Sequence, residues 1–337
     1  CYFINYRHFN FNKSDSNYKL LYFDNFSFSN YTWVIMTSIC VLGNFVADNS
    51  FYADQLPTKG QTLFGNGYLV GPGGKGSNQA IAAVRLGSKV SFLGKVGDDS
   101  NGQMAIELYK KNQIDPKTVF ISKDIPTGVA GIMINKLDGT NAIIVYPGAS
   151  MEITIEEVNQ FSNILSNCKV FLTQHEIKKE VTLHSLKIAK KGSAITILNP
   201  APAIKIEDNF FKYIDFFTPN ETEAEFYVGK KIETYEQAKE AGEYFLKKGV
   251  KNSIITLGEK GIYFSNQDDS FSLPALNLKG KVVDTTGAGD SFNGALASGL
   301  EKGMKIKECL NYAIKASGIS TTKKGAADAM PYLKDIN

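Results

Sequence analysis

A glycine-rich segment near the carboxyl end of the chain, Asp284-Thr285-Thr286-Gly287-Ala288-Gly289-Asp290, is followed directly by an apolar run. The pattern predicts the end of a strand, a tight turn and the start of a helix, whose first N–H groups have no partner within the helix. We expect the N–H groups of Gly287, Ala288 and Gly289 to bind an oxyanion or a phosphate at the positive end of the helix dipole. Asp290 would lie where a base could take a proton from a hydroxyl group that attacks the bound phosphorus. On this segment alone, an ordinary N-capped helix is an equally good interpretation.

A second glycine-rich segment, Gly71-Pro72-Gly73-Gly74-Lys75-Gly76-Ser77-Asn78-Gln79, precedes another predicted helix. Its glycines match the GxGxxG spacing of dinucleotide-binding enzymes, with Asp98 and Asp99 about 20 residues further on, so an NAD-dependent dehydrogenase is one interpretation. Two observations argue against it. The segment does not follow the first predicted core strand, and the side chain of Lys75 would occupy the space that a pyrophosphate needs.

A cradle for a polyhydroxylated ligand is the alternative interpretation of the same segment. The glycines would let the ligand approach the backbone, while Lys75 and Asn78 would donate hydrogen bonds to hydroxyl groups. Asp48, just after the first predicted strand, could accept from two hydroxyl groups or could simply cap a loop. A phosphate site, a carboxylate base and a hydroxyl cradle in one chain indicate a kinase that acts on a small alcohol.

Composition narrows the class of protein. The 337 residues are 43% hydrophobic and 21% charged, which is ordinary for a globular protein of one large or two small domains. A net charge of +3, without clusters of Lys and Arg among aromatic residues, argues against a nucleic-acid partner. The four cysteines are scattered and there are three histidines, so neither a disulfide framework nor a histidine-rich metal centre is indicated. No apolar stretch approaches the roughly 20 residues of a membrane span. We therefore expect a reduced, cytoplasmic setting, with the nucleus also open.

The chain divides at Met36. Residues 1–35 are rich in Asn, Phe, Tyr and Ser without helical or strand periodicity, and we interpret them as an N-terminal extension, disordered or artefactual. From Met36 to residue 337, short apolar strands alternate with amphipathic helices, which predicts a mostly parallel sheet with helices on both faces. Strands are expected at 39–42, 90–95, 170–174, 194–198, 214–218, 253–257 and 261–264. Helices are expected near 79–86, 102–111, 155–165, 181–190, 235–248, 287–301 and 307–322. The segments 48–68 and 127–149 look like strands without an intervening helix and predict a separate small sheet.

Five stretches in family order carry a resemblance to known proteins. They are Gly73-Gly74-Lys75-Gly76-Ser77-Asn78-Gln79-Ala80, Gly97-Asp98-Asp99-Ser100, Asn199-Pro200-Ala201-Pro202-Ala203, Thr218-Pro219-Asn220-Glu221-Thr222-Glu223-Ala224-Glu225, and residues 284–294. From about Met36 to its end, the chain resembles the ribokinase branch of the ribokinase-like (PfkB-type) carbohydrate kinases. The resemblance implies a three-layer α/β fold with a small β-sheet lid, which often clasps a second subunit in a homodimer. It also implies transfer of phosphate from ATP to the 5-hydroxyl of D-ribose, with Mg²⁺ and a K⁺ activator.

The resemblance also implies roles for individual residues. Asp290 would be the catalytic base, with Gly287, Ala288 and Gly289 as the anion hole. The residues implied to hold the sugar are Val46, Ala47, Asp48, Gly74, Lys75, Gly76, Ser77, Asn78, Glu176 and Asp290. Those implied to line the ATP site are Asn199, Asn220, Glu223, Thr256, Leu257, Gly258, Glu259, Lys260, Gly261, Gly289 and Ile314. The potassium loop would comprise Asp284, Thr286, Ser320, Lys323, Gly325 and Ala329, mostly through backbone carbonyls. Among these residues, Asn220 and Glu223 would position magnesium and phosphate through water.

Four positions depart from the family pattern. Val46 stands where an Asn often precedes the sugar-binding Asp, which removes one possible hydroxyl contact. Pro72, Ile314 and Ala329 replace residues that relatives often have beside the cradle, the adenine and the monovalent ion. Because Val46 bears most directly on the sugar, 2-deoxyribose, fructose or a nucleoside such as adenosine stays open as the substrate.

Overall fold

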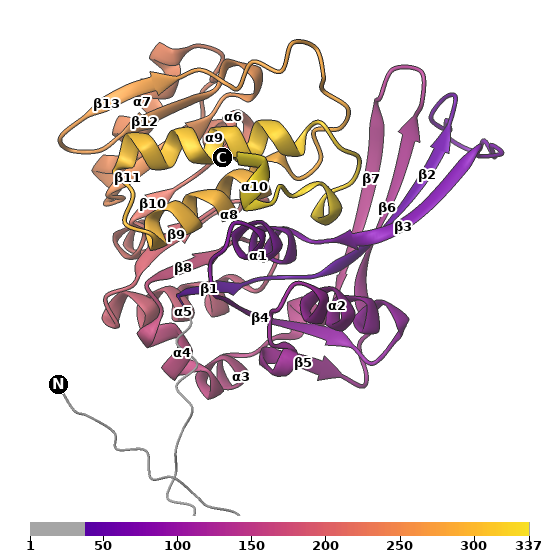
Figure 1. The fold of residues 1–337 in the computed structure, drawn as a ribbon, viewed down its shortest axis with the longest axis horizontal. Helices are drawn as coiled ribbons and strands as arrows, with labels where there is room; N and C mark the ends of the chain where they lie inside the picture. Colours follow the sequence, from indigo (N-terminus) through magenta and orange to yellow (C-terminus); the bar gives the residue numbers. More distant parts are fainter. Residues whose placement is uncertain (1–37, 337) are drawn as a thin grey trace, which may run out of the picture. The chain divides into compact units, whose positions relative to one another are not determined.

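The computed structural model describes residues 38–336, which form an α/β fold with two sheets (Figure 1). Within these residues the larger sheet has nine strands, in the order β13-β12-β11-β10-β9-β8-β1-β4-β5. They are β1 (Ile39–Leu42), β4 (Val90–Gly97), β5 (Val119–Ser122), β8 (Val170–Thr173), β9 (Ile195–Leu198), β10 (Phe216–Phe217), β11 (Asn252–Thr256), β12 (Ile262–Ser265) and β13 (Ser270–Leu273). Neighbours from β5 to β11 are parallel, whereas β12 and β13 add antiparallel at one edge. The extension predicted for residues 1–35 lies outside the described residues.

Successive residues of a strand point to opposite faces, and β1 shows how this builds two cores. Ile39 and Val41 belong to one buried apolar cluster, and Cys40 and Leu42 belong to another. All four side chains are fully buried. A strand that is apolar at every position therefore lies between two layers of helices, as the sequence predicts.

The helices divide between these two clusters. The side that contains Ile39 is covered by α1 (Lys75–Arg85), α2 (Ser100–Lys111), α8 (Ala288–Glu301), α9 (Ile306–Ser320) and the short α10 (Leu333–Ile336). The opposite side is covered by α3 (Ile155–Gln160), α4 (Ser162–Asn167), α5 (Lys179–Lys191), α6 (Glu221–Val228) and α7 (Tyr235–Lys248). The predicted three-layer arrangement is confirmed.

The second sheet has the order β3-β2-β6-β7 and projects to one side of the helices in Figure 1. Its strands are β2 (Val46–Ala53), β3 (Gly67–Gly73), β6 (Thr127–Asn135) and β7 (Asn141–Gly148). The separate sheet predicted from 48–68 and 127–149 is confirmed, but β3 runs on to Gly73. Large apolar side chains of this sheet are exposed, among them Phe51, Tyr68, Leu69, Ile144 and Tyr146.

Several predicted boundaries are wrong. The helix expected at 155–165 is two short helices, because Phe161 leaves helical geometry with φ −110° and ψ 18°. The strands β5 and β13 were not predicted, since both lie at the edges of the sheet and lack a continuous buried run. The strand expected before Asp284 is also absent from the described structure, in which β13 ends at Leu273 and no strand follows.

Helix α1 begins at Lys75, four residues before the predicted start, so residues 75–78 form its first turn and not a loop. Gly74 caps this helix with φ 90°, a conformation that favours glycine. A Cβ atom on Gly76 would lie 2.7 Å from the Cα atom of Gly43. These glycines therefore let the helix start pack directly on the loop after β1, a structural role in addition to the predicted one in ligand approach.

We predict that Gly76→Ala destabilises the protein by about 1–3 kcal/mol, because backbone atoms of the β1 loop must move to admit the methyl group. Urea unfolding measures the loss. Gly71→Ala is the matched control, since a Cβ atom on Gly71 would meet nothing within 4 Å, and it should change stability by less than about 0.5 kcal/mol. Equal stability of the two variants would contradict the close packing described for Gly76.

Candidate functional site

Polar side chains follow the carboxyl ends of five adjacent strands in the larger sheet. Asn44 follows β1, Gln174 follows β8, Asn199 follows β9, Thr218 follows β10 and Thr256 ends β11. The carboxyl ends of parallel strands meet at one edge, where ligands of open α/β sheets bind. The strand order also reverses direction at β1, which pairs with β4 on one side and β8 on the other. The candidate site lies at this edge.

The first turn of α8 lies over the same edge. Gly287 caps the helix with φ 75°, and Asp290 is buried in the first turn. In the described part of the chain, no acceptor is hydrogen-bonded to the N–H groups of Gly287 and Gly289. The N–H group of Ala288, however, donates to the carbonyl oxygen of Thr285 at 3.2 Å. The prediction of three free N–H groups is therefore corrected to two, because the turn before the helix uses one.

A cavity of about 160 Å³ joins these two regions. Its lining comprises Lys75, Asn199, Ala201, Thr218, Asn220, Glu223, Thr256, Thr285, Gly287, Ala288, Gly289, Asp290 and Asn293. Residues from both glycine-rich segments and from the predicted ATP site thus share one cavity. Ala201, Thr218, Thr285 and Asn293 were not predicted.

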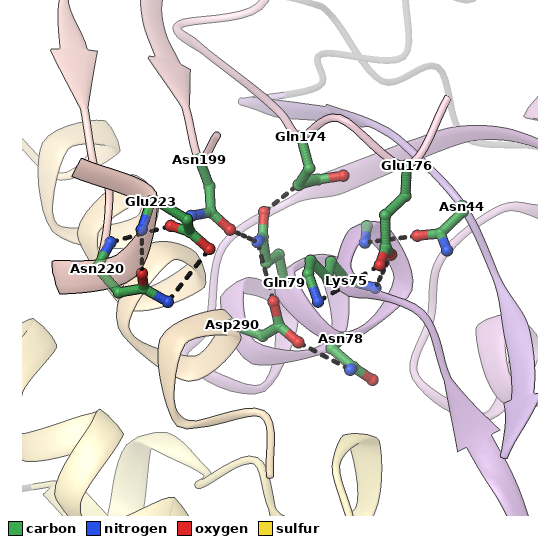
Figure 2. A network of polar contacts seen from close by, with 11 residues as sticks. Asn44, Lys75, Asn78, Gln79, Gln174, Glu176, Asn199, Asn220, Glu223 and Asp290 are labelled. Carbon is green, nitrogen blue, oxygen red and sulfur yellow. Dashed lines mark hydrogen bonds and ion pairs between the residues drawn. The ribbon is translucent and has the colours of Figure 1, made fainter. Parts of the chain in front are cut away.

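The carboxylate of Asp290 has a donor on each oxygen (Figure 2). Asn78 Nδ2 donates to Oδ2 at 2.9 Å, and Gln79 Nε2 donates to Oδ1 at 3.0 Å. Burial raises the pKa of Asp290 to about 6, although Lys75, Asn78 and Gln79 each lower it. A buried carboxylate with a pKa near neutrality has the properties of a general base.

Lys75, a residue of the predicted sugar site, is held by a second carboxylate. Its backbone N–H group donates to Glu176 Oε2 at 3.1 Å, and its Nζ atom lies 3.3 Å from Glu176 Oε1. Burial alone would lower the pKa of Lys75, but the charges of Glu176 and Asp290 raise it above its ordinary value. Lys75 therefore stays protonated and can donate to an anion or a hydroxyl group.

Two polar groups on this side lack protein partners among residues 38–336. The buried Oδ1 atom of Asn78 accepts no hydrogen bond, and no donor is bonded to the carboxylate of Asp48. Burial, together with the charges of Glu176 and Asp290, raises the pKa of Asp48 to about 6. Gly73 leaves room for this carboxylate, because a Cβ atom there would lie 2.2 Å from Asp48 Oδ2. The buried Oδ1 atom of Asn78 and the half-buried carboxylate of Asp48 suit a ligand that carries hydroxyl groups.

The remaining residues of the predicted sugar site differ in orientation. Ser77 and Ala47 are fully buried, and the Ser77 side chain lies beside Tyr109 in the core. The backbone N–H group of Gly76 donates to Asn44 Oδ1 at 3.2 Å. Val46 begins β2 and is buried. The side chain of Ser77 thus supports the helix start and does not face the cavity.

Asn220 and Glu223 form a capping box at the start of α6. Asn220 Oδ1 accepts from the Glu223 N–H group at 2.8 Å, and Glu223 Oε2 accepts from the Asn220 N–H group at 2.9 Å. Burial raises the pKa of Glu223. The backbones of Asn220 and Thr256 pair in a parallel bridge, which brings the two residues together at the cavity.

Asn199 and Gly289 also line this cavity, but the other predicted ATP residues do not. Leu257 and Ile314 are buried in the two apolar clusters. The turn Gly258–Lys260 is a 3-10 helix that follows Thr256 and Leu257, and Gly261 comes next with φ 98°. Glu259 is exposed, and Lys260 Nζ donates to the carbonyl oxygen of Glu233 at 2.6 Å.

The predicted potassium loop is tied together by Asp284. Its Oδ1 accepts from the N–H group of Thr286 and its Oδ2 from that of Gly325, both at 2.9 Å. Ser320 is buried, and its hydroxyl donates to the carbonyl oxygen of Ser317. Residues 38–336 donate no hydrogen bond to five carbonyl oxygens of this loop, which are those of Asp284, Thr286, Lys323, Gly325 and Ala329. No group of three or more His, Cys, Asp or Glu side chains in these residues could hold a metal ion.

The buried polar residues that support the side chains and backbone of the site were not predicted from the sequence. Gln79 and Gln174 are fully buried, and Asn293 Nδ2 donates to the carbonyl oxygen of Gly289 at 2.9 Å. Thr218 Oγ1 in turn donates to Asn293 Oδ1 at 2.7 Å. For Gln79 and Asn293 the available signal was a polar residue inside an apolar helix pattern, which also describes many surface positions. Gln174 and Thr218 follow strands and carry no such signal.

The dinucleotide interpretation does not fit this geometry. Gly71 and Gly73 lie in β3, a strand of the small sheet, and not in a turn after a core strand. Lys75 points into the site beside Glu176 (Figure 2). The dehydrogenase hypothesis is therefore wrong. Among helices of the described chain, none has the length and apolar character needed to cross a membrane.

Residues 36–333 match the model of the pfkB family carbohydrate kinases. A curated relative, deoxyribokinase of Salmonella typhi, is 33% identical over 303 residues, covering 89% of this chain and 97% of the relative. The structure of ribokinase from Thermotoga maritima has a TM-score of 0.81 at 35% identity and covers 89% of this chain and 98% of that one. The structure of Arabidopsis thaliana ribokinase complexed with ribose and ATP has a TM-score of 0.83 at 30% identity, covering 90% and 98%.

Proposed function

The chain belongs to the pfkB family of carbohydrate kinases, and we propose that it transfers the γ-phosphoryl group of ATP to the 5-hydroxyl group of D-ribose. The products are ribose 5-phosphate and ADP. The observation that carries this proposal is the buried carboxylate of Asp290, which shares a cavity with Lys75 and with the free N–H groups at the start of α8. The similarity to ribokinases, one of them bound to ribose and ATP, supports the choice of substrates.

In the proposed reaction Asp290 accepts the proton of the 5-hydroxyl group while the hydroxyl oxygen attacks the γ-phosphorus and ADP leaves. The N–H groups of Gly287 and Gly289 stabilise the negative charge on the transferring phosphoryl group. Lys75, fixed by Glu176, adds a positive charge on the sugar side. Asp48 and the free Oδ1 atom of Asn78 accept hydrogen bonds from ring hydroxyl groups. Positioning and charge stabilisation are the main requirements of phosphoryl transfer.

We assign the ATP side to the residues beyond Asp290. Asn199, Asn220, Glu223 and Thr256 line that part of the cavity. The carboxylate of Glu223 is buried and suits a water ligand of Mg²⁺, which would neutralise charge on the phosphates when bound. The turn Gly258–Lys260, with Leu257, Gly261 and Ile314 around it, would lie beside the base and ribose of the nucleotide.

We also propose a potassium site in the loops that Asp284 joins. Potassium prefers oxygen ligands, and the carbonyl groups of Asp284, Thr286, Lys323, Gly325 and Ala329 accept no hydrogen bond within the described chain. These carbonyl oxygens are suitable ligands for a monovalent cation. When bound, the ion would add positive charge near the anion hole and reinforce the loop that precedes it.

We also propose a division of the chain into domains that is consistent with a sugar kinase. Residues 36–337 would act as one ribokinase-like domain whose small sheet closes over the sugar, with residues 1–35 as an extension. The exposed apolar side chains of the small sheet, such as Tyr68 and Ile144, suit contact with a second copy in a homodimer. Buried free thiols at Cys40, Cys168 and Cys309 favour a cytoplasmic setting.

2-Deoxyribose is a second candidate substrate. The chain is 33% identical to a deoxyribokinase, and Val46 offers no hydrogen bond where an Asn often stands in ribokinases. An apolar side chain near the sugar weakens the discrimination against a substrate that lacks one hydroxyl group.

We predict that Asp290→Ala lowers kcat for ribose phosphorylation by at least about 10²-fold, since general-base catalysis contributes this much or more. The variant should fold and bind ATP, because removal of a buried charge does not open the core. ADP release measures turnover, and thermal unfolding with and without ATP checks the fold. Near-normal turnover would exclude Asp290 as the base.

We predict an acid limb in the pH profile of kcat/KM with a midpoint near pH 6. Asp290 and Asp48 both have pKa values of about 6 in the free protein, and protonation of Asp290 removes the base, so activity falls as the pH drops through this value. The limb belongs to the coupled pair of carboxylates. Ribose and 2-deoxyribose should give the same midpoint, because the pKa values are those of the enzyme. A midpoint near 4, the ordinary value of Asp, would contradict the described burial.

An ADP-release assay with ribose, 2-deoxyribose, fructose and adenosine, with and without potassium, tests the proposed substrate. We expect ribose to give the highest kcat/KM, by about tenfold over 2-deoxyribose, because one lost hydrogen bond to a buried acceptor costs at least this factor. Potassium should raise the rate, whereas sodium at equal ionic strength is the control. A preference for 2-deoxyribose would favour the second candidate substrate.

A further inference from the structure

Gln79 has no role in the reaction described above, yet its side chain contacts both halves of the site. It lies in the second turn of α1 and is fully buried. Its Nε2 atom is 3.0 Å from Asp290 Oδ1 and 3.0 Å from Asn199 Oδ1 (Figure 2). Its Oε1 atom accepts a hydrogen bond from Gln174 Nε2 at 2.5 Å. All polar atoms of this amide are therefore used.

The orientation of the three amides is determined by groups that can only accept. Asn199 Nδ2 donates to the carbonyl oxygen of Thr218 at 3.1 Å, so Asn199 must present its oxygen to Gln79. The ionised carboxylate of Asp290 also only accepts. Gln79 must direct its nitrogen toward both, and its oxygen consequently faces Gln174. This arrangement satisfies all polar atoms of Gln79 and Asn199 and is fixed at one end by a backbone carbonyl, whereas the buried Oε1 atom of Gln174 accepts no hydrogen bond from the described residues.

This arrangement acts directly on the Asp290 carboxylate. Gln79 occupies one lone pair of Oδ1, and Asn78 occupies one of Oδ2. An ionised carboxylate has about four lone-pair sites, so each oxygen keeps one that can face a substrate hydroxyl. Two donors on different oxygens also prevent rotation of the carboxylate. Hydrogen bonds to a charged carboxylate are stronger than those to a neutral carboxyl group, so the two donors favour the ionised form.

The packing of α1 on α8 explains why an amide reaches this position. A Cβ atom on Gly294 would lie 2.5 Å from the carbonyl oxygen of Gln79, so the two helices are in close backbone contact there. Loss of this amide alone would leave the buried polar groups that it contacts without a partner, which is costly. Here the nitrogen of the amide bonds only to residues of the candidate site.

We propose that Gln79 is a positioning residue that holds the Asp290 carboxylate ionised and in one orientation, and that joins it to Asn199 on the nucleotide side. The inference rests on the proposed function for the identity of Asp290 as the base. The Nε2 atom of Gln79 donates both to Asp290 on the sugar side and to Asn199 on the nucleotide side, so the positions of these two residues depend on the same amide group.

Gln79→Met tests this role, because it keeps the volume and removes the donor. We expect the midpoint of the acid limb of kcat/KM to rise by about one pH unit and kcat to fall about tenfold or more, since a hydrogen bond to a charged group is lost. Gln174→Met leaves Gln79 in place but removes the donor that orients it, so we expect a smaller shift in the same direction. It also serves if Gln79→Met fails to fold.

Ser88→Ala is the matched control. Ser88 Oγ donates a hydrogen bond to Ser298 Oγ at 2.9 Å. This buried contact joins the loop after α1 to α8 and lies outside the site. This variant should lose stability without moving the acid limb. If Gln79→Met and Gln174→Met lower kcat but leave the midpoint where it is in Ser88→Ala, the residue is structural only and the proposal is overturned.

A second readout does not depend on the substrate. The carboxyl carbon of Asp290 can be titrated by NMR in the enzyme without ligands, with Asp290→Asn to assign the signal. We expect its pKa to rise by about one unit in Gln79→Met. An unchanged pKa would overturn the positioning role even if ribose is phosphorylated. A raised pKa together with no activity on any pentose would instead leave the positioning role standing and refute the proposed function.

Discussion

A buried, ionised carboxylate is stable only where hydrogen-bond donors or cations surround it, and Asp290 imposes this requirement on the whole site. Its donors, Asn78 and Gln79, both come from the start of α1. Helix α1 must therefore pack closely against α8, and Gly294 allows the contact because it has no side chain. The start of α1 is in turn fixed on the β1 loop, where Gly76 meets the backbone of Gly43. The geometry of the proposed active site and the packing of α1 on α8 thus depend on each other.

The hydrogen bonds from Asn78 and Gln79 offset only part of the free energy that the Asp290 carboxylate loses when it is removed from water. The pKa values of Asp290 and Asp48 are about 6, against ordinary values of 3.8. The folded protein therefore binds more protons than the unfolded chain between about pH 4 and pH 6, and its stability falls as the pH rises through this window. At neutral pH both charges lower the free energy of unfolding. The same unfavourable burial makes Asp290 a better proton acceptor, so the site gains reactivity where the fold loses stability.

The sequence was informative where local pattern and chemistry coincide. The buried strand β1, with four apolar residues in succession, and helix α7 were predicted with their observed boundaries. Asp290 and Lys75 could be selected because each directly follows a glycine of a glycine-rich segment. Gln79 could not, since its importance comes from partners 120 and 211 positions away along the chain. The edge strand β13 was missed for a related reason, because its pairing with β12 and not its own composition makes it a strand.

The two halves of the site are positioned by different means. Asn44, Gln174 and Asn199 follow strands of the sheet, so strand pairing determines their spacing. Helix α8 has no strand directly before it, and residues 274–287 return to the site without regular pairing. The N–H groups of Val283 and Asp284 instead donate to the carbonyl oxygen of Thr321, and the Asp284 carboxylate binds the N–H group of Gly325. Asp284 therefore positions the start of α8, which holds the proposed anion hole, and strand pairing positions the opposite side of the site. A cation bound by the free carbonyl groups of these loops would act on the same connection, so its effect on catalysis would reach Asp290 through the backbone of α8.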